Sequence, residues 1–299
     1  MASRQDLDWL HGREPLASGS HPATPPPGRP RSSRRGLLVG GAATLGLAGL
    51  GLAGLETLRT GPGLPGIGGG VGPRGKPTCL DASQLASASR IGRARIIYEP
   101  TGKPATMRFD AGFLGQLEAW MADFEATSRY GGSTEVWSYG AHVVKDQCRS
   151  WHANGRAFDI SRLRIGSTPV VSAREDLWHE ASAERQAELR RRYWTLAASL
   201  HLHFAYVLTH HFDPEHRNHI HVDNGLSGSG MSSFSRGSRV QNQAVQAICQ
   251  SIWGQQGEVT GQWDETRDQA GPVLAELGLR DLRRQETWQA FLRASVQRG

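Results

Sequence analysis

Lysine is nearly absent from this 299-residue chain, which contains only Lys76, Lys103 and Lys145. The formal net charge of +6 therefore comes almost entirely from arginine, a bias that indicates a GC-rich coding sequence. A basic surface of this kind favours an anionic polymer as a partner. Nucleic acid is one such polymer, but the sequence has no basic stripe with interleaved aromatic residues and no zinc-finger spacing. We therefore expect no nucleic-acid partner.

Cysteine is also scarce, with only Cys79, Cys148 and Cys249 in the chain. If the chain is exported, we expect Cys79 to pair with Cys148 or with Cys249, which leaves one free thiol. The sequence does not choose between these two pairings. Three unpaired, buried cysteines are the alternative.

The N-terminal part has little that can build a core. Residues 1–32 are polar and Pro-rich, which predicts disorder. Arg34 and Arg35 then precede a Gly- and Ala-rich apolar stretch that ends at Leu55, a pattern that resembles a twin-arginine export signal. The stretch is long enough to span a bilayer, which takes a helix of about 20 residues. No Ala-x-Ala cleavage site follows it.

These features predict a disordered leader with an export signal or transmembrane anchor over residues 1–59. The protein is then either secreted or anchored in the membrane with its C-terminal part outside. A Gly-rich helix buried in a cytosolic protein is the alternative. Residues 60–78 are rich in Gly and Pro and predict a flexible linker.

Alternating apolar and polar residues predict four neighbouring strands near 135–139, 157–161, 204–208 and 219–223. Helical periodicity predicts helices over Ala111–Arg129, with Asp110 as its N-cap, and over Ser182–Leu200. Shorter elements are expected at Cys79–Ala88 (a helix), Arg93–Glu99 and Met107–Asp110 (strands). The expected fold class is α+β, a small antiparallel sheet with helices packed on one face, in a domain over residues 79–235.

A small helical module is expected at residues 240–299, after a Gly- and Ser-rich segment. The run from Val259 to Thr266 faintly resembles a repeat of helical peptidoglycan-binding domains, although it is one residue short of that pattern. The module is therefore either a wall-binding element or a plain helical cap on the main domain.

The most informative stretch runs from Ser150 to Asp159. It places His152 and Asp159 seven residues apart, with Gly155 between them. The residues after Gly155 alternate as in a strand, so Asp159 shares a face with the small Ala157. Gly155 permits a tight bend that folds His152 back over Asp159. An imidazole and a carboxylate brought together in this way suit a zinc site, which needs further ligands.

A second strand pattern, in residues 219–223, supplies a further candidate ligand. His219, His221 and Asp223 share one face, and the apolar residues between them face the core. His152, Asp159 and His221 then give three protein ligands and leave a fourth position for water, as in catalytic zinc sites. His219 is the candidate catalytic residue for proton transfer. Asp223 either orients an imidazole or is a solvated strand-end carboxylate.

The spacing Ser-x-His-x-x-Gly-x-Ala-x-Asp, from Ser150 to Asp159, resembles the first signature of the zinc peptidases that include D-alanyl-D-alanine carboxypeptidases and share their fold with the hedgehog signalling domain. Those proteins close the site with Glu-x-x-His or His-x-His, and this chain offers the latter at His219 and His221. Tyr139 and Cys148-Arg149 upstream resemble the extensin-like C-terminal domain family more specifically. The resemblance covers roughly residues 79–224.

The resemblance implies an exported, zinc-dependent (Zn²⁺) hydrolase that acts on amide bonds of cell-wall peptidoglycan, which is also the expected partner. Arg149 and Ser150 are the candidate substrate-binding residues, because an arginine can hold a carboxylate in bidentate fashion; a solvated charge is the alternative for Arg149. A non-catalytic cell-wall-binding protein that keeps the zinc-peptidase fold is the alternative function, since Glu-x-x-His is missing.

Overall fold

The fold is an eight-stranded sheet with helices on one face, seen in a computed structural model that describes residues 77–143, 148, 150–225 and 231–299. The main strand order is β2-β3-β6-β7-β10-β9. Its members are β2 (Arg90–Ile91), β3 (Ala94–Tyr98), β6 (Glu135–Gly140), β7 (Ala157–Ile165), β10 (Ile220–Asp223) and β9 (Tyr206–Leu208). Two further strands pair with β3 and β7, namely β4 (Lys103–Pro104) and β8 (Thr168–Ser172).

The four strands expected from alternation are β6, β7, β10 and β9, and they are neighbours in that order. The α+β prediction is therefore confirmed. One pair differs from the expected antiparallel pattern, because β3 and β6 run parallel. The chain between them passes through a helix, and such a crossover returns the next strand in the same direction.

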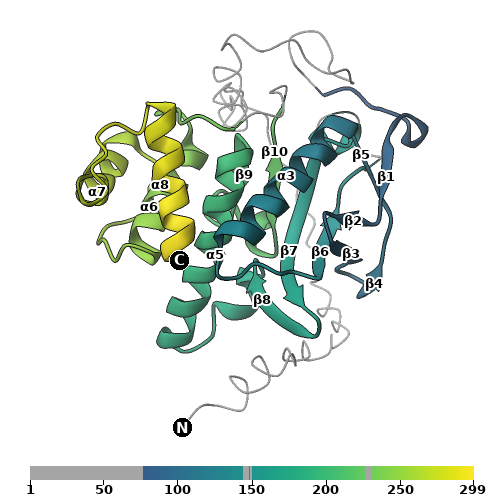
Figure 1. The fold of residues 1–299 in the computed structure, drawn as a ribbon, viewed down its shortest axis with the longest axis horizontal. Helices are drawn as coiled ribbons and strands as arrows, with labels where there is room; N and C mark the ends of the chain where they lie inside the picture. Colours follow the sequence, from purple (N-terminus) through teal and green to yellow (C-terminus); the bar gives the residue numbers. More distant parts are fainter. Residues whose placement is uncertain (1–76, 144–147, 149, 226–230) are drawn as a thin grey trace, which may run out of the picture.

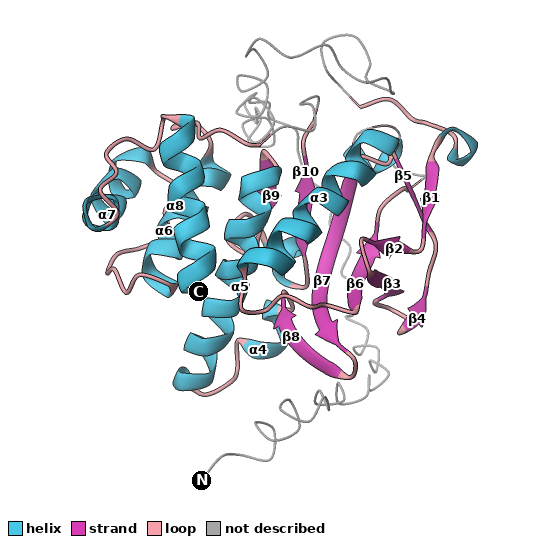
Figure 2. Ribbon diagram, in the orientation of Figure 1, coloured by secondary structure: helices cyan, strands magenta, loops and turns pink. Residues whose placement is uncertain are grey.

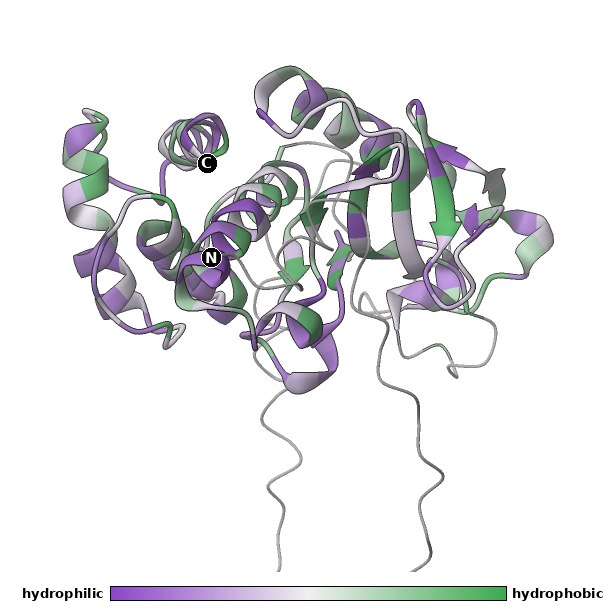
Figure 3. Cartoon of the chain, turned by 90° about the horizontal axis from the view of Figure 1, so that it is seen from below, coloured by the Kyte–Doolittle hydropathy of each residue, from purple (hydrophilic) through white to green (hydrophobic). Residues whose placement is uncertain are grey.

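Two long helices, α3 (Ala111–Thr127) and α5 (Ala183–His203), lie across one face of the sheet (Figure 2). Both begin as expected: the Asp110 side chain accepts a hydrogen bond from the Phe113 amide, and Ser182 accepts one from the Arg185 amide. Helices in Figure 3 carry both hydrophobic and hydrophilic residues, as expected for helices that bury one side.

The predicted helix over Cys79–Ala88 is wrong for most of its length. Only one 3₁₀ turn forms, η3 (Ala82–Gln84), where Asp81 and Gln84 cap each other's backbone. The chain then continues as β1 (Ala86–Ala88), which pairs with β5 (Met107–Phe109) in a separate two-stranded sheet. This partner lies some twenty residues further along the chain, so the strand is stabilised by a contact outside the segment.

Three C-terminal helices, α6 (Arg239–Ser251), α7 (Trp263–Glu276) and α8 (Gln285–Arg298), gather on the side of the molecule away from β1–β4 (Figure 1). Their buried apolar residues belong to the same hydrophobic cluster as those of the sheet and α5. Trp288 of α8 also donates a hydrogen bond from its indole N–H to Ser232 Oγ at 2.9 Å. This continuous packing favours the helical-cap interpretation; the wall-binding role stays a prediction.

The predicted leader, the arginine pair of the export signal and nearly all of the linker lie outside the described residues. Within the described part of the chain, no helix has the length and apolar character needed to cross a membrane. Of the two cysteine pairings expected from the sequence, the structure contains Cys79–Cys148, with the Cα atoms 4.8 Å apart. Cys249 is buried in α6 as a free thiol.

Candidate metal centre

The candidate centre lies where β7 and β10 pair, on the sheet face opposite the long helices. Asp159 of β7 and His221 of β10 are direct antiparallel partners. Their strand neighbours, among them Phe158, Ile160 and Ile220, are fully buried in the core. Because successive side chains of a strand point to opposite faces, Asp159 and His221 project together from the other side.

His152 reaches the same point from a 3₁₀ turn, η4 (Trp151–Asn154), that precedes β7. Ser150 caps this turn, since its hydroxyl accepts a hydrogen bond from the His152 amide at 3.1 Å. Gly155 ends the turn in the left-handed conformation, with φ of 69°. A Cβ atom there would lie 2.8 Å from the Asp110 amide nitrogen, so only glycine fits this close approach.

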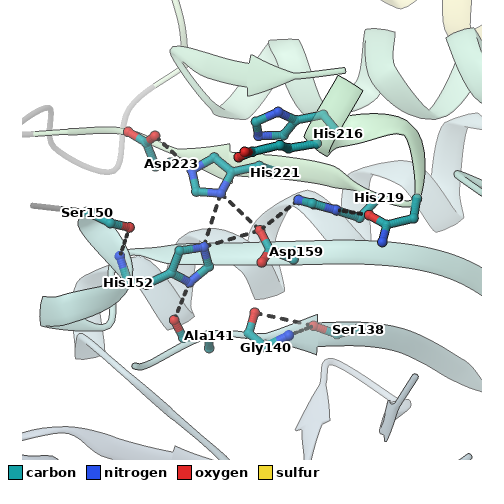
Figure 4. Close-up of polar contacts among 12 residues, drawn as sticks. Ser138, Gly140, Ala141, Ser150, His152, Asp159, His216, His219, His221 and Asp223 are labelled. Carbon is teal, nitrogen blue, oxygen red and sulfur yellow. Dashed lines mark hydrogen bonds and ion pairs between the residues drawn. The ribbon is translucent and has the colours of Figure 1, made fainter. Parts of the chain in front are cut away.

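The three predicted ligands converge (Figure 4). His152 Nε2 lies 3.2 Å from Asp159 Oδ1 and 3.1 Å from His221 Nδ1, and His221 Nδ1 lies 2.9 Å from Asp159 Oδ1. The three side chains therefore each direct one possible ligand atom to the same small space.

The backbone and a second carboxylate fix the orientation of both imidazoles. His152 Nδ1 is hydrogen-bonded to the Ala141 carbonyl oxygen, which can only accept, so Nδ1 carries a proton and Nε2 is the nitrogen that faces the centre. His221 Nε2 lies 3.1 Å from Asp223 Oδ2, which leaves Nδ1 to face the centre. Imidazole ligands of metals are commonly held by such outer partners. Of the two positions that the sequence left open for Asp223, the structure shows the one in contact with an imidazole.

The pKa values of His221 and Asp159 are both shifted strongly by the contacts at the centre. Burial alone would lower the pKa of His221, but hydrogen bonds to Asp159 and Asp223 and the charges of both carboxylates raise it to about 10. Burial would likewise raise the pKa of Asp159, but His152 and His221 hold it well below its usual range. In the metal-free protein, a His221 imidazolium therefore directs a proton from Nδ1 into the space that the three atoms share.

Zinc fits this set of donors. Two imidazole nitrogens and one carboxylate oxygen form a common ligand set of catalytic zinc. In a tetrahedral site with bonds of ~2.0–2.1 Å, ligand atoms lie ~3.3 Å apart, so these three atoms need to spread by only a few tenths of an ångström. A metal ion held by these three residues would replace the Nδ1 proton of His221, and the Asp159 and Asp223 carboxylates would offset its positive charge.

His219 lies beside this cluster, as expected for a residue that assists without ligating. Its Nε2 is 3.6 Å from Asp159 Oδ1, further than the atoms of the three candidate ligands are from one another. The ring of Tyr139 lies close to it, with the centroids 5.9 Å apart. Burial lowers the pKa of His219 to about 4, against the opposing charge of Asp159, so its imidazole is neutral at pH 7.

One residue of the site did not emerge from the sequence. His216 lies in η5 (Pro214–Arg217), with its ring centroid 5.1 Å from His219 and 6.0 Å from His221. Its Nδ1 is 2.6 Å from the Asp213 carboxylate, which caps the same turn. The sequence signal was the pair Asp213-Pro214, which marks a helical turn and places a histidine three residues after a carboxylate.

Of the two predicted substrate-binding residues, the structure describes only Ser150. Arg149 lies outside the described residues. Ser150 is present at the centre as the cap of the turn that carries His152, and its contact with a substrate stays a prediction. His210 and His211, which the sequence did not favour as ligands, line a separate cavity.

Residues 138–232 match the family model for the extensin-like protein C-terminus. The match covers about a third of the chain and spans every residue that converges at the candidate centre. Neither the curated proteins nor the solved structures give a match.

Proposed function

We propose that this protein is an exported zinc-dependent hydrolase that cleaves amide bonds of cell-wall peptidoglycan. The observation that carries the proposal is the convergence of His152, Asp159 and His221, with Asp223 and the Ala141 carbonyl behind them. Support for the substrate comes from the resemblance of the Ser150–Asp159 spacing to the D-alanyl-D-alanine carboxypeptidase type of zinc peptidase. A disulfide between Cys79 and Cys148 is in keeping with an oxidising compartment outside the cytoplasm.

Zinc, when bound, lowers the pKa of a water molecule to ~7 and polarises a carbonyl group. The protein's own residues then have separate tasks. His152, Asp159 and His221 hold the ion, and Asp223 keeps the His221 ring in the ligating orientation. His219 is neutral at pH 7, so it can accept a proton close to the reacting atoms and return it to the leaving amine.

His216 is the second candidate for proton transfer. Its Nδ1 is held by the Asp213 carboxylate at 2.6 Å, which fixes the orientation of the ring, as a carboxylate does for a catalytic histidine in other hydrolases. This pair supplies an acid–base group in a chain that lacks the Glu-x-x-His motif. If neither His216 nor His219 can take this role, the alternative function applies, a non-catalytic protein that binds the cell wall.

The test is incubation of the zinc-loaded chain with purified peptidoglycan, followed by mass spectrometry of the soluble fragments and assay of new amino groups. We expect new amines from the wild type and none from His221→Ala. The matched control is His179→Ala, a histidine outside the centre whose side chain is 36% exposed. Binding to peptidoglycan without new amines in the wild type identifies the non-catalytic alternative.

A further inference from the structure

A polar cavity lies where the main domain meets the C-terminal helices. Its volume is about 450 Å³, within the usual range of small-molecule pockets of about 300–1,000 Å³. The turn after β9, the short helix α4 (Glu175–Trp178), α5 and the end of α6 form its walls. Its lining includes the aromatic and uncharged polar side chains of Trp178, Trp194, His210, His211, Gln250 and Ser251.

The two histidines of the cavity are packed as neutral aromatic rings. Their centroids are 4.2 Å apart, and His211 stacks on Trp194 at 5.6 Å with an interplanar angle of 18°. Burial lowers the pKa of His210 to about 3 and that of His211 to about 4. Each ring therefore offers one N–H donor and one nitrogen acceptor. His210 Nδ1 is buried and has no hydrogen-bond partner among the described residues.

The charged residues around the cavity balance one another. The Glu175 carboxylate is paired with Arg217 at 2.6 Å. Arg190 and Glu258 carry opposite charges and are both exposed. No excess of one sign is left to select an ion, so the walls suit an uncharged ligand with several donors and acceptors.

We propose that this cavity binds an uncharged saccharide unit. Hydroxyl and acetamido groups of a sugar match the imidazole nitrogens, the Gln250 amide and the Ser251 hydroxyl. The apolar face of a sugar ring can pack on the half-buried imidazole rings of His210 and His211, which the buried Trp194 and Trp178 support from behind.

The cavity is joined to the candidate metal centre through a single turn. Arg217 follows His216 in η5, and its guanidinium holds Glu175 in the cavity wall, while His216 contacts the rings of His219 and His221. If the proposed function holds, the cavity receives the glycan part of the same polymer whose peptide reaches the centre. The saccharide site itself does not depend on catalysis.

The test uses the full chain and β-1,4-linked N-acetylglucosamine trimer as the probe, with binding measured by calorimetry. We expect saturable binding by the wild type. Ser251→Trp fills the cavity and should weaken binding at least tenfold, and Gln250→Leu should weaken it about tenfold through loss of hydrogen bonds. Gln297→Trp, at an exposed position of α8, is the matched control and should bind as the wild type does. Thermal unfolding of each variant shows that it folds.

His152→Ala separates this inference from the proposed function, because it removes a candidate zinc ligand and leaves the cavity unchanged. Trimer binding that persists in His152→Ala supports the saccharide site even where hydrolysis is never found. The inference is overturned if the wild type does not bind the trimer, or if folded Ser251→Trp and Gln250→Leu bind it as well as the wild type. Hydrolysis of peptidoglycan without trimer binding leaves the proposed function in place and removes only the cavity site.

Discussion

Zinc binding should release a proton from His221, and this gives the most direct test of the centre. In the metal-free protein the pKa of His221 is raised to about 10, so the imidazole is protonated at neutral pH. Its Nδ1 proton occupies the position that a metal ion needs, 2.9 Å from Asp159 Oδ1. The pKa of Asp159 is already far below its usual range, so this carboxylate has no proton to release. We therefore expect about one proton to leave His221 for each zinc ion bound at pH 7–8.

The size of the effect follows from the same pKa. Each pH unit below the pKa of a ligand weakens the apparent metal affinity about tenfold, or ~1.4 kcal/mol. At pH 7, about three units below the pKa, His221 alone should weaken zinc binding by ~1,000-fold relative to its deprotonated form, or ~4 kcal/mol. The apparent affinity should rise as the pH rises, by about tenfold for each unit between pH 7 and pH 9.

Calorimetry in two buffers of different protonation enthalpy measures the released protons directly. Asp223→Asn is the informative variant, because it removes one of the two carboxylates that raise the pKa of His221. This variant should release fewer protons than the wild type at pH 8.5, and it should bind zinc ~10–100-fold more weakly because the ring loses its orienting partner. Wild-type zinc affinity that stays flat from pH 6.5 to 8.5, with no proton released, refutes the proposed ligation by His221.

Three further predictions test the roles of single residues. His221→Ala should lose zinc as well as hydrolysis, whereas His219→Ala should keep zinc and lose only rate; equal metal loss in plasma emission analysis means that the roles are misassigned. Replacement of Arg34 and Arg35 by lysine should keep the protein in the cytoplasm on cell fractionation, and unchanged export contradicts the twin-arginine signal. Buried His201 has its pKa lowered to about 3, so folding loses ~2 kcal/mol from this group between pH 6.5 and pH 5 as the unfolded chain takes up its proton; His201→Leu should remove this share of the slope in urea titrations, while His210, His211 and His219 keep theirs.

The sheet could be predicted where each strand carries its own alternating pattern. Residues 157–161 and 219–223 have polar and apolar residues in alternation, and both form central strands of the sheet. Residues 86–88 read Ala-Ser-Ala, an alternation of small residues too short to indicate a strand by itself, and their strand exists because β5 pairs with it. The parallel pairing of β3 and β6 likewise depends on a crossover that strand patterns do not encode.

Some residues of the candidate centre could likewise be predicted from the sequence and others could not. Asp159 and His221 could be predicted to share a face because a strand has a period of two, and the antiparallel register places them opposite each other. The turn of His216 is marked in the sequence by Asp213-Pro214, but its place beside the centre is not, because that depends on the ion pair of Arg217 with Glu175. The Ala141 carbonyl that fixes the His152 tautomer carries no sequence signal, since every residue has such an oxygen.

His152 is the ligand whose placement required the most from the rest of the fold. Its turn is fixed at one end by Gly155, where the backbone of Asp110 leaves no space for a Cβ atom. Leu80 donates a hydrogen bond from its amide to the Ala153 carbonyl at 3.0 Å, and the disulfide joins the neighbouring Cys79 to Cys148. The sequence could predict a bend at Gly155. It could not predict the contacts of this turn with Asp110 and with the segment at Leu80, because both are tertiary contacts. The sequence motif therefore names the ligand, while contacts from residues far along the chain hold its imidazole over Asp159.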